Sequence, residues 1–216
     1  MEELILHEVV SYQDYRFNFK IMKKILLCGY DWAGCKALEL LNKNKNQIYV
    51  YTHPDRPHDP SLWQYASELK IPYTFEKVQE ANLPFKPDLI CSVYYRYIIE
   101  EAVIAKCKGK IFNLHPSLLP MYRGASSITN ALINGDKKIG YTFHYIDKNI
   151  DTGKIIFQDA LEVSDYETQL NIYQKVMFTA MQHFNEVVDQ VIDGFIGIEQ
   201  LGKSSYYNRG VPNEGQ

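Results

Sequence analysis

The chain has 216 residues, a length that suits one globular domain with a short appendage. Hydrophobic residues make up 46% of it, including 17 Tyr and 10 Phe, and this content excludes an intrinsically disordered chain. A net charge of −3 gives no overall attraction to nucleic acid or to an anionic membrane, although the net charge of the whole chain does not reveal a local basic patch.

The four cysteines, Cys28, Cys35, Cys91 and Cys107, form no Cys-x-x-Cys pair. Each stands in apolar or helical surroundings, where a free cysteine commonly serves as a small buried apolar side chain. The sequence begins with no signal peptide, and it has no run of about 18 apolar residues that would span a bilayer. We therefore expect a reduced, cytoplasmic protein that is not bound to a membrane.

The elements of the first half alternate between strands and helices. Residues 1–21 show no clear period and are expected to form a non-catalytic extension, so that the domain begins at Met22. Short apolar runs, typical of buried parallel strands, then alternate with helical segments, which predicts an α/β fold with a Rossmann-like, doubly wound, mostly parallel sheet. The expected strands are 25–28, 47–52, 72–75, 89–93 and 110–113, and the expected helices are 33–41, 61–69 and 98–106.

The second half has longer elements. A helix is expected over 126–134, followed by strands over 138–145 and 154–162 that are separated by a loop at 146–153. Ser164 and Glu167 match a capping box, and apolar residues at helical spacing predict a long C-terminal helix that Gly194 ends near residue 193. The catalytic domain is expected to cover 22–203, and 204–216 to form a polar C-terminal tail, which belongs either to a minimal domain or to a truncated one.

The most informative stretch runs from Asn113 to Gly124, Asn-Leu-His-Pro-Ser-Leu-Leu-Pro-Met-Tyr-Arg-Gly. It starts where a strand ends, and the carboxyl edge of an open parallel sheet is where such folds bind ligands. Asn113 and His115 are two positions apart, so an extended backbone points both side chains to the same side. Two prolines stiffen the loop that follows. A lone histidine near a strand end is usually structural, but the pair is less easily explained that way.

This stretch resembles the signature of the folate-dependent formyltransferases, Asn-x-His-[Pro/Ala]-Ser-Leu-Leu-Pro followed downstream by Asp-x-Gly. The second element is Asp151-Thr152-Gly153, and Asp151 follows Asn113 by 38 positions, as the resemblance requires. The likeness extends from Met22 to the end of the chain. It implies the formyltransferase fold, 10-formyltetrahydrofolate as co-substrate, no metal, and Asn113, His115 and Asp151 as catalytic residues.

The three residue types suit formyl transfer. A neutral amine attacks a formamide-like carbonyl, and the oxygen of the tetrahedral intermediate becomes negative. Asn113 can donate a hydrogen bond to that oxygen, and a cationic His115 can do so more strongly; a preorganised donor of this kind is worth ~3–4 kcal/mol. Asp151 would orient the imidazole, favour its charged form, and relay the proton that the amine loses. Taken alone, Asp151 would be read as a turn residue.

The resemblance implies a pteridine slot between residues 94–98 and 146–150. Backbone groups would make most contacts, so the side chains there predict little, and a solvated loop with aromatic packing explains Arg96 and the tyrosines equally well. The residues that the resemblance assigns to folate binding are Tyr95, Arg96, Tyr97, Ile98, Asp147 and Ile150.

The acceptor site is read from the loop at 29–34. It is neither G-x-G-x-x-G nor a P-loop, and two glycines around a strand-to-helix turn usually indicate no more than a tight turn. A helix N-terminus still attracts phosphate, so a phosphate-bearing acceptor is expected there. The residues expected to contact the acceptor are Gly29, Tyr30, Trp32, His53, Arg56, Ser117, Tyr122 and Arg123.

Three acceptors are compatible with the resemblance. The stretch 120–125 is similar to sugar and methionyl-tRNA formyltransferases, and the tail 204–215 is similar to a Tyr-Tyr-x-Arg-x-Pro segment of the sugar enzymes. We rank a nucleoside-diphosphate-linked amino-deoxysugar first, for surface polysaccharide synthesis of the O-antigen type, and methionyl-tRNA or glycinamide ribonucleotide below it. No nucleic-acid partner is expected, and a homodimer is left open. The alternative from another class is an inactive folate- or nucleotide-binding module.

Overall fold

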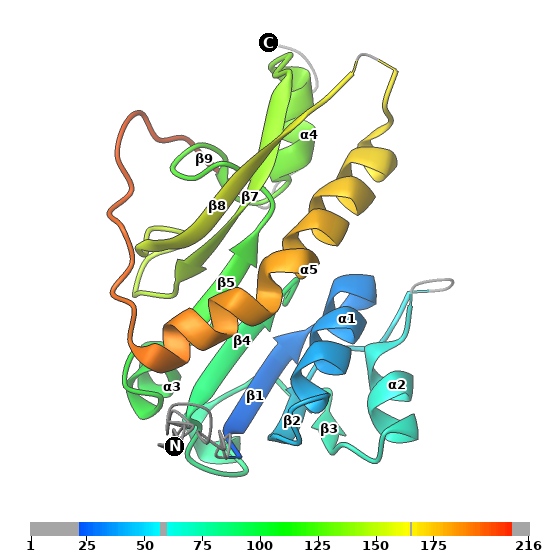
Figure 1. Ribbon diagram of the computed structural model, residues 1–216, viewed down its shortest axis with the longest axis vertical. Coiled ribbons are helices and arrows are strands. Elements are labelled where there is room, and N and C mark those ends of the chain that lie inside the picture. The colour runs from blue at the N-terminus through cyan, green and yellow to red at the C-terminus, as the bar shows by residue number, and fades with distance from the viewer. Residues whose placement is uncertain (1–21, 57–59, 165, 209–216) are drawn as a thin grey trace, which may run out of the picture.

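The computed structural model describes residues 22–56, 60–164 and 166–208. Its centre is a seven-stranded sheet in the order β3-β2-β1-β4-β5-β7-β8 (Figure 1). The first five strands in that order are parallel, whereas β7 and β8 are antiparallel to their neighbours. The strand bounds are β1 Lys24–Gly29, β2 Gln47–Tyr51, β3 Tyr73–Thr74, β4 Leu89–Val93, β5 Ile111–His115, β7 Lys138–Tyr145 and β8 Ile155–Glu162.

Alternating apolar residues give the sheet a buried layer on each face. Ile25 and Leu27 of β1 belong to the larger core cluster, which α1 (Asp31–Asn42) and α5 (Gln169–Asp193) cover (Figure 1). Leu26 and Cys28 belong to a second cluster on the other face, with Val103 of α3 (Glu101–Lys106). Both faces are covered, which explains why the parallel strands read as continuous apolar runs. The prediction of a doubly wound sheet is confirmed.

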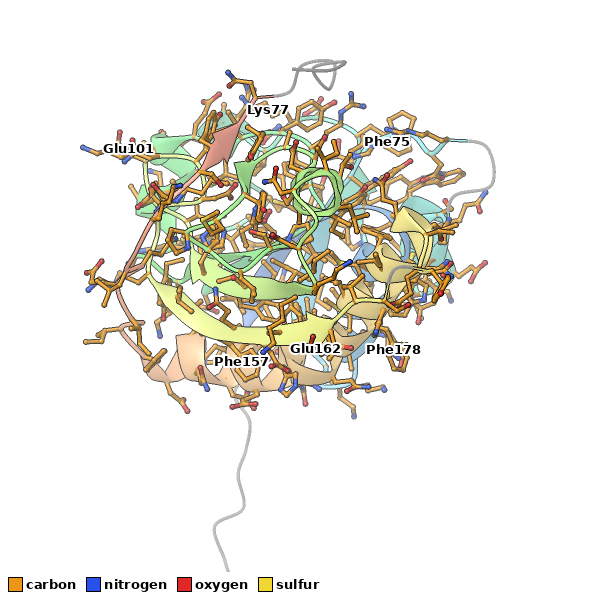
Figure 2. The ribbon with its side chains drawn as sticks, turned by 90° about the horizontal axis from the view of Figure 1, so that it is seen from above. Phe75, Lys77, Glu101, Phe157, Glu162 and Phe178 are labelled. Carbon is orange, nitrogen blue, oxygen red and sulfur yellow. The ribbon has the colours of Figure 1, made fainter. Side chains whose placement is uncertain are left out.

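The remaining elements are short. They are α2 Leu62–Glu68, the 3₁₀ turn η1 Glu80–Asn82, α4 Ser127–Ile133, and a separate two-stranded sheet of β6 Arg123–Gly124 and β9 Tyr206–Tyr207. Viewed along the long axis, Phe157 of β8 and Phe178 of α5 lie on one side of the molecule, and Phe75, after β3, lies on the other (Figure 2). Among the described residues, no helix is both long and apolar enough to cross a membrane.

The long helix α5 ends as predicted at Gly194, which adopts a φ of +87° that favours glycine. Its start differs. The carboxylate of Glu167 accepts a hydrogen bond from the Ser164 amide as the capping box requires, but the helix begins at Gln169, where Thr168 caps the amide of Asn171. The helix predicted from residue 98 begins at Glu101, because Glu100 still has extended backbone. The predicted extension 1–21 and residues 209–216 of the predicted tail lie outside the described residues.

The topology puts ligand-binding positions at one edge of the sheet. The chain runs outward from β1 to β2 and β3 on one side, and returns to β4 and β5 on the other. In open sheets of this kind, the crevice where the strand order reverses lies at the carboxyl ends of the strands and binds ligands. Here that point lies between β1 and β4, one strand from β5, which carries Asn113 and His115.

Candidate active site

Three neighbouring strands bring the first part of the site together. In the sheet register, Asn113 of β5 lies beside Ser92 of β4 on one side and beside His144 of β7 on the other. Ser92 Oγ donates a hydrogen bond of 2.8 Å to Asn113 Oδ1. This contact fixes the amide so that its Nδ2 faces β7, where it lies 3.2 Å from Nε2 of His144. Asn113 therefore presents its donor group in one defined orientation.

Asp151 joins this group from the loop between β7 and β8. Its Oδ2 lies 3.4 Å from Nδ1 of His115, and its Oδ1 lies 3.4 Å from Nε2 of His144. The backbone amide of Gly124 donates to the same Oδ2 at 2.8 Å. An amide, an imidazole and a carboxylate that are distant in the sequence thus gather in one small region, as the sequence motif predicts. We call Asn113, His115, His144 and Asp151 the catalytic cluster.

The backbone of the Asp151 loop explains the Asp-x-Gly spacing. Asp151 adopts a φ of +55°, a left-handed conformation that costs a residue with a side chain roughly 1–2 kcal/mol. Gly153 passes so close to the Tyr145 carbonyl that a Cβ there would lie 1.8 Å from its oxygen. Only glycine fits this position, and the tight passage holds the loop against the end of β7.

His115 is buried, and the atoms around it favour one protonation pattern. Its Nε2 lies 2.8 Å from the Tyr122 carbonyl, which assigns a proton to that nitrogen, and 3.2 Å from Ser127 Oγ. Burial lowers the pKa of His115, and the charge of Asp151 opposes this effect without cancelling it. The expectation of a cationic His115 is therefore not supported by this geometry, because desolvation outweighs the carboxylate. A neutral ring can instead receive a proton at Nδ1, beside Asp151.

Asp151 stays ionised in this environment. Burial alone would raise its pKa, but the hydrogen bond of His144, the attraction to the His115 and His144 rings once acid protonates them, and the Gly124 amide outweigh burial and lower the pKa to about 2. The carboxylate is thus a fixed negative charge next to the His115 ring. It can stabilise the imidazolium that forms when His115 takes up a proton.

The two segments predicted to bind folate, residues 94–98 and 146–150, pack against the same core cluster. Tyr95 and Ile146 both pack against the smaller core cluster, and Tyr95 also accepts a hydrogen bond from the Val78 amide through its hydroxyl. Ile98 and Ile150 are exposed apolar side chains at 65% and 40% of their surface. The Arg96 guanidinium lies 5.6 Å from the centre of the Tyr97 ring. Asp147 Oδ1 accepts hydrogen bonds from the Asn149 amide and the Thr152 hydroxyl, which shapes the loop.

Several residues predicted to bind the acceptor gather at the carboxyl ends of β1 and β2. The ring of His53 stacks on Tyr30 at 3.8 Å and meets the edge of Tyr97 at 6.2 Å. The Tyr30 hydroxyl accepts a hydrogen bond from the Arg56 amide at 3.0 Å. Within the part of the chain that the structure describes, the buried Thr52 hydroxyl and both His53 ring nitrogens have no hydrogen-bond partner. We call Tyr30, Thr52 and His53 the β2-end cluster.

Other predicted acceptor residues make contacts inside the protein. Ser117 Oγ donates to the Met121 carbonyl, and the Tyr122 hydroxyl donates to Asp136. The Arg123 guanidinium donates to Gln200 Oε1 at 2.6 Å. Trp32 stacks at 6.3 Å on Phe178 of α5. Gly29 packs against Leu62, which comes within 3.2 Å of where a Cβ would lie, so this glycine serves the packing of α2 on β1.

Sequence reasoning missed three polar residues of the site. His144 and Ser92 stand in segments correctly read as strands, and only the register across β4, β5 and β7 shows that they flank Asn113. The period-2 alternation of a strand puts His144 on the same face as Thr142, and this placement could have been predicted from the sequence alone. Gln200 lies far along the chain, and its role depends on a bridge to β8 that no local pattern indicates.

This fold and site define the class of protein. The formyl transferase family model matches residues 34–188, and the chain belongs to this family. It is a folate-dependent N-formyltransferase. The enzyme named GDP-perosamine N-formyltransferase, from Brucella melitensis, is 37% identical over 197 residues, which cover 88% of this chain and 76% of that protein.

Two solved structures are similar in fold and in sequence. WlaRD, a sugar 3N-formyltransferase determined with dTDP and 5-N-formyl-THF, aligns with a TM-score of 0.76 and 25% identity over 87% of this chain and 70% of its own. The N-formyltransferase of Helicobacter canadensis, in complex with folinic acid and dTDP-3-aminofucose, gives the same TM-score and identity over 88% and 71%. Among the members of the family, the chain is thus similar to those that act on sugars.

Proposed function

We propose that this enzyme transfers the formyl group of 10-formyltetrahydrofolate to the amine of a nucleoside-diphosphate-linked amino-deoxysugar. The product would be an N-formyl sugar for a surface polysaccharide. The observation that carries the proposal is the catalytic cluster, in which Asn113, His115 and Asp151 converge at the carboxyl end of β5. The proteins that are similar to this chain include sugar N-formyltransferases, one of them named for GDP-perosamine.

The catalytic cluster supplies each group that formyl transfer needs. The neutral amine attacks the formyl carbon, a C–N bond forms, and the carbonyl oxygen becomes negative. Asn113, with its amide fixed by Ser92, donates to that oxygen. The amine then loses a proton, which the neutral His115 takes at Nδ1, directly or through a water, while Asp151 stabilises the resulting cation. Collapse of the intermediate breaks the bond between the formyl carbon and the folate nitrogen. That nitrogen takes up the proton held by His115, directly or through a water, so that tetrahydrofolate leaves and the ring is neutral again.

The exposed apolar residues near the site fit the folate co-substrate. Ile98 follows β4, and Ile150 directly precedes Asp151, so both lie on segments that lead to the catalytic cluster. Covering an exposed isoleucine with a flat aromatic ring is favourable, by about 25 cal/mol for each Å² of apolar surface that is removed from water. We propose Tyr95, Arg96, Tyr97, Ile98, Asp147 and Ile150 as the residues around the pteridine.

The position of the β2-end cluster fits an extended acceptor. Three strand spacings separate β5 from β2, which amounts to about 14 Å. An acceptor whose amine lies at β5 can therefore place its nucleoside and phosphates near β2. There, among the described residues, His53 and Thr52 offer buried polar atoms without a hydrogen-bond partner, and Arg96 and Arg56 place positive charge near the His53 ring, opposed in part by Asp55. A small amine such as that of glycinamide ribonucleotide would leave this end of the site uncovered.

A panel of acceptors tests the proposal. Purified enzyme with 10-formyltetrahydrofolate is offered GDP-, dTDP- and UDP-linked amino sugars, glycinamide ribonucleotide and methionyl-tRNA, and tetrahydrofolate release is measured. We expect turnover with at least one sugar nucleotide and none with methionyl-tRNA. Turnover of methionyl-tRNA alone would overturn the acceptor assignment, and ligand binding without any turnover would favour an inactive binding module.

A further inference from the structure

The segment after α5 returns to the active site. Residues 197–207, which we call the C-terminal strap, lie beyond the range 34–188 that the family model matches. The chain leaves the end of α5 and runs back along one edge of the molecule to β9, beside β6 (Figure 1). On the way it contacts the backbone on both sides of the catalytic cluster, at the Asp151 loop and at residues 122–125.

Gln200 of the strap holds the Asp151 loop through its side-chain amide. Its Nε2 donates to the carbonyl of Asp151 at 3.0 Å and to that of Gly153 at 2.8 Å. The two carbonyls flank the turn in which Asp151 takes its left-handed conformation. A backbone held in such a conformation persists only when its surroundings fix it, and two hydrogen bonds from a single amide do so here. The other side of the loop is fixed by Tyr145, whose amide donates to the Lys154 carbonyl.

The end of the strap holds the segment on the other side of the cluster. Ser205 accepts hydrogen bonds from the Tyr122 amide through Oγ and from the Arg123 amide through its carbonyl, and the Tyr207 carbonyl accepts from the Ala125 amide. This segment supplies the Tyr122 carbonyl next to His115 Nε2 and the Gly124 amide that donates to Asp151. The strap thus supports the Tyr122 carbonyl, which contacts His115, and the Gly124 amide, which contacts Asp151.

The strap is anchored where it begins and is exposed in its middle. Ile198 exchanges two backbone hydrogen bonds with Ile155 at the start of β8, at 2.7 and 2.8 Å. The Oε1 of Gln200 accepts two hydrogen bonds from the Arg123 guanidinium, which ties the two supported segments to each other. Between the anchors, Leu201 is 80% exposed and Lys203 is also exposed. The contacts are therefore concentrated at the positions that face the site.

We propose that the C-terminal strap is part of the catalytic apparatus, and that Gln200 is a positioning residue that aligns the Asp151 carboxylate with His115. Gln200 does not reach the reacting atoms; it acts through the backbone of Asp151 and Gly153. The kinetic part of the proposal depends on the proposed formyl transfer, whereas the structural part does not. A misplacement of a catalytic group by about 1 Å can cost ~10²-fold in rate.

Two substitutions separate this role from a simple anchor. Gln200→Ala removes the bonds to both carbonyls and to Arg123, whereas Gln200→Glu keeps an acceptor for Arg123 but turns a carboxylate toward the two carbonyls. We expect both variants to lose about 10- to 100-fold in kcat while KM for each substrate changes less than ~3-fold. Lys203→Ala is the matched control on the exposed part of the strap and should behave as wild type. If Gln200→Glu equals wild type, the contact with Arg123 alone matters and the proposal is wrong.

A second readout does not depend on turnover. The ring nitrogens of His115 are followed by NMR titration in the wild type, in Gln200→Ala and in Lys203→Ala, without substrates. If Gln200 aligns Asp151, its loss weakens the support that this charge gives to the imidazolium, and His115 titrates at lower pH than in the wild type. An unchanged titration overturns the proposal. A shifted titration in an enzyme that formylates no acceptor would support the strap's role while the proposed function fails.

Discussion

The two polar clusters at the carboxyl edge of the sheet differ in how their atoms are paired. In the catalytic cluster, Asn113, His115 and Asp151 each have at least two polar neighbours in the folded protein. In the β2-end cluster, both nitrogens of His53 and the hydroxyl of Thr52 are buried without a hydrogen-bond partner among the described residues. The first cluster is complete before any ligand binds, whereas the second has donors and acceptors to spare.

The difference separates chemistry from recognition. Groups that act on a transition state gain most when neighbours already hold them in place, since no reorganisation is needed during the reaction. A buried polar atom without a partner costs about 1–3 kcal/mol, which a ligand returns when it supplies the missing hydrogen bond. Substitutions should therefore lower kcat in the catalytic cluster, and should raise KM for the acceptor in the β2-end cluster.

The largest effect is expected for Asp151→Asn. The neutral amide cannot stabilise the imidazolium of His115, so kcat should fall by ~10²–10⁴-fold in the formyl-transfer assay. Asp159→Asn, on the exposed part of β8, is the control and should keep wild-type activity. Equal turnover of the Asp151 and Asp159 variants would remove the carboxylate from the mechanism.

Asn113→Ala should come next. Loss of a preorganised oxyanion donor is expected to lower kcat by ~10²–10³-fold. Ser92→Ala leaves the amide in place but releases its orientation, so its loss should be smaller and about tenfold. A Ser92 variant as impaired as the Asn113 variant would show that the serine has a role beyond orienting the amide.

The stability of the fold should depend on pH through the catalytic cluster. The pKa values of His115 and Asp151 lie below their ordinary values of 6.5 and 3.8, so the folded state binds fewer protons than the unfolded one. The free energy of unfolding should fall as pH drops below about 6.5, and the Asp151 part, roughly 2 kcal/mol, should be lost between about pH 4 and 2. Urea unfolding at a series of pH values measures this, and Asp151→Asn should flatten the most acidic part of the curve. An equally steep decline in that variant would contradict the assigned pKa of Asp151.

The smallest and most diagnostic change is His53→Phe. The new ring can keep the stacking on Tyr30 while it removes both unpaired nitrogens, so stability should stay the same or rise. KM for the sugar nucleotide should increase about tenfold, as for the loss of one ligand hydrogen bond of ~1.4 kcal/mol, with kcat and the folate KM unchanged. A fall in kcat without a change in acceptor KM would erase the distinction between the two clusters.

The sequence predicted the parts of this molecule that local patterns determine. The continuous apolar runs of β1 and β4 indicated buried parallel strands, and the glycine at 194 marked the end of α5. The spacing of Asn113, His115 and Asp151, through its resemblance to a family, was sufficient to predict that these three side chains gather in one region. The partners of that set were not predictable in this way, because Ser92 and His144 become neighbours of Asn113 only through strand register, and Gln200 reaches Asp151 only through tertiary contacts.

The protonation of His115 shows a second limit of the sequence. The pairing with Asp151 was foreseeable, and on its own it favours the charged ring. The depth of burial was not foreseeable, and it decides the direction of the pKa shift. Desolvation depends on everything packed around the ring, and here it outweighs the Asp151 charge and the Tyr122 carbonyl, which both raise the pKa of His115.

The most direct measurement compares wild type with His115→Ala in a single-turnover transfer of labelled formyl from 10-formyltetrahydrofolate, with folate affinity measured in parallel. The catalytic cluster predicts a rate ~10²–10⁴-fold lower in the variant and an unchanged folate Kd. Equal transfer rates, with folate bound equally well by both proteins, would contradict the role of His115 and of the cluster around it.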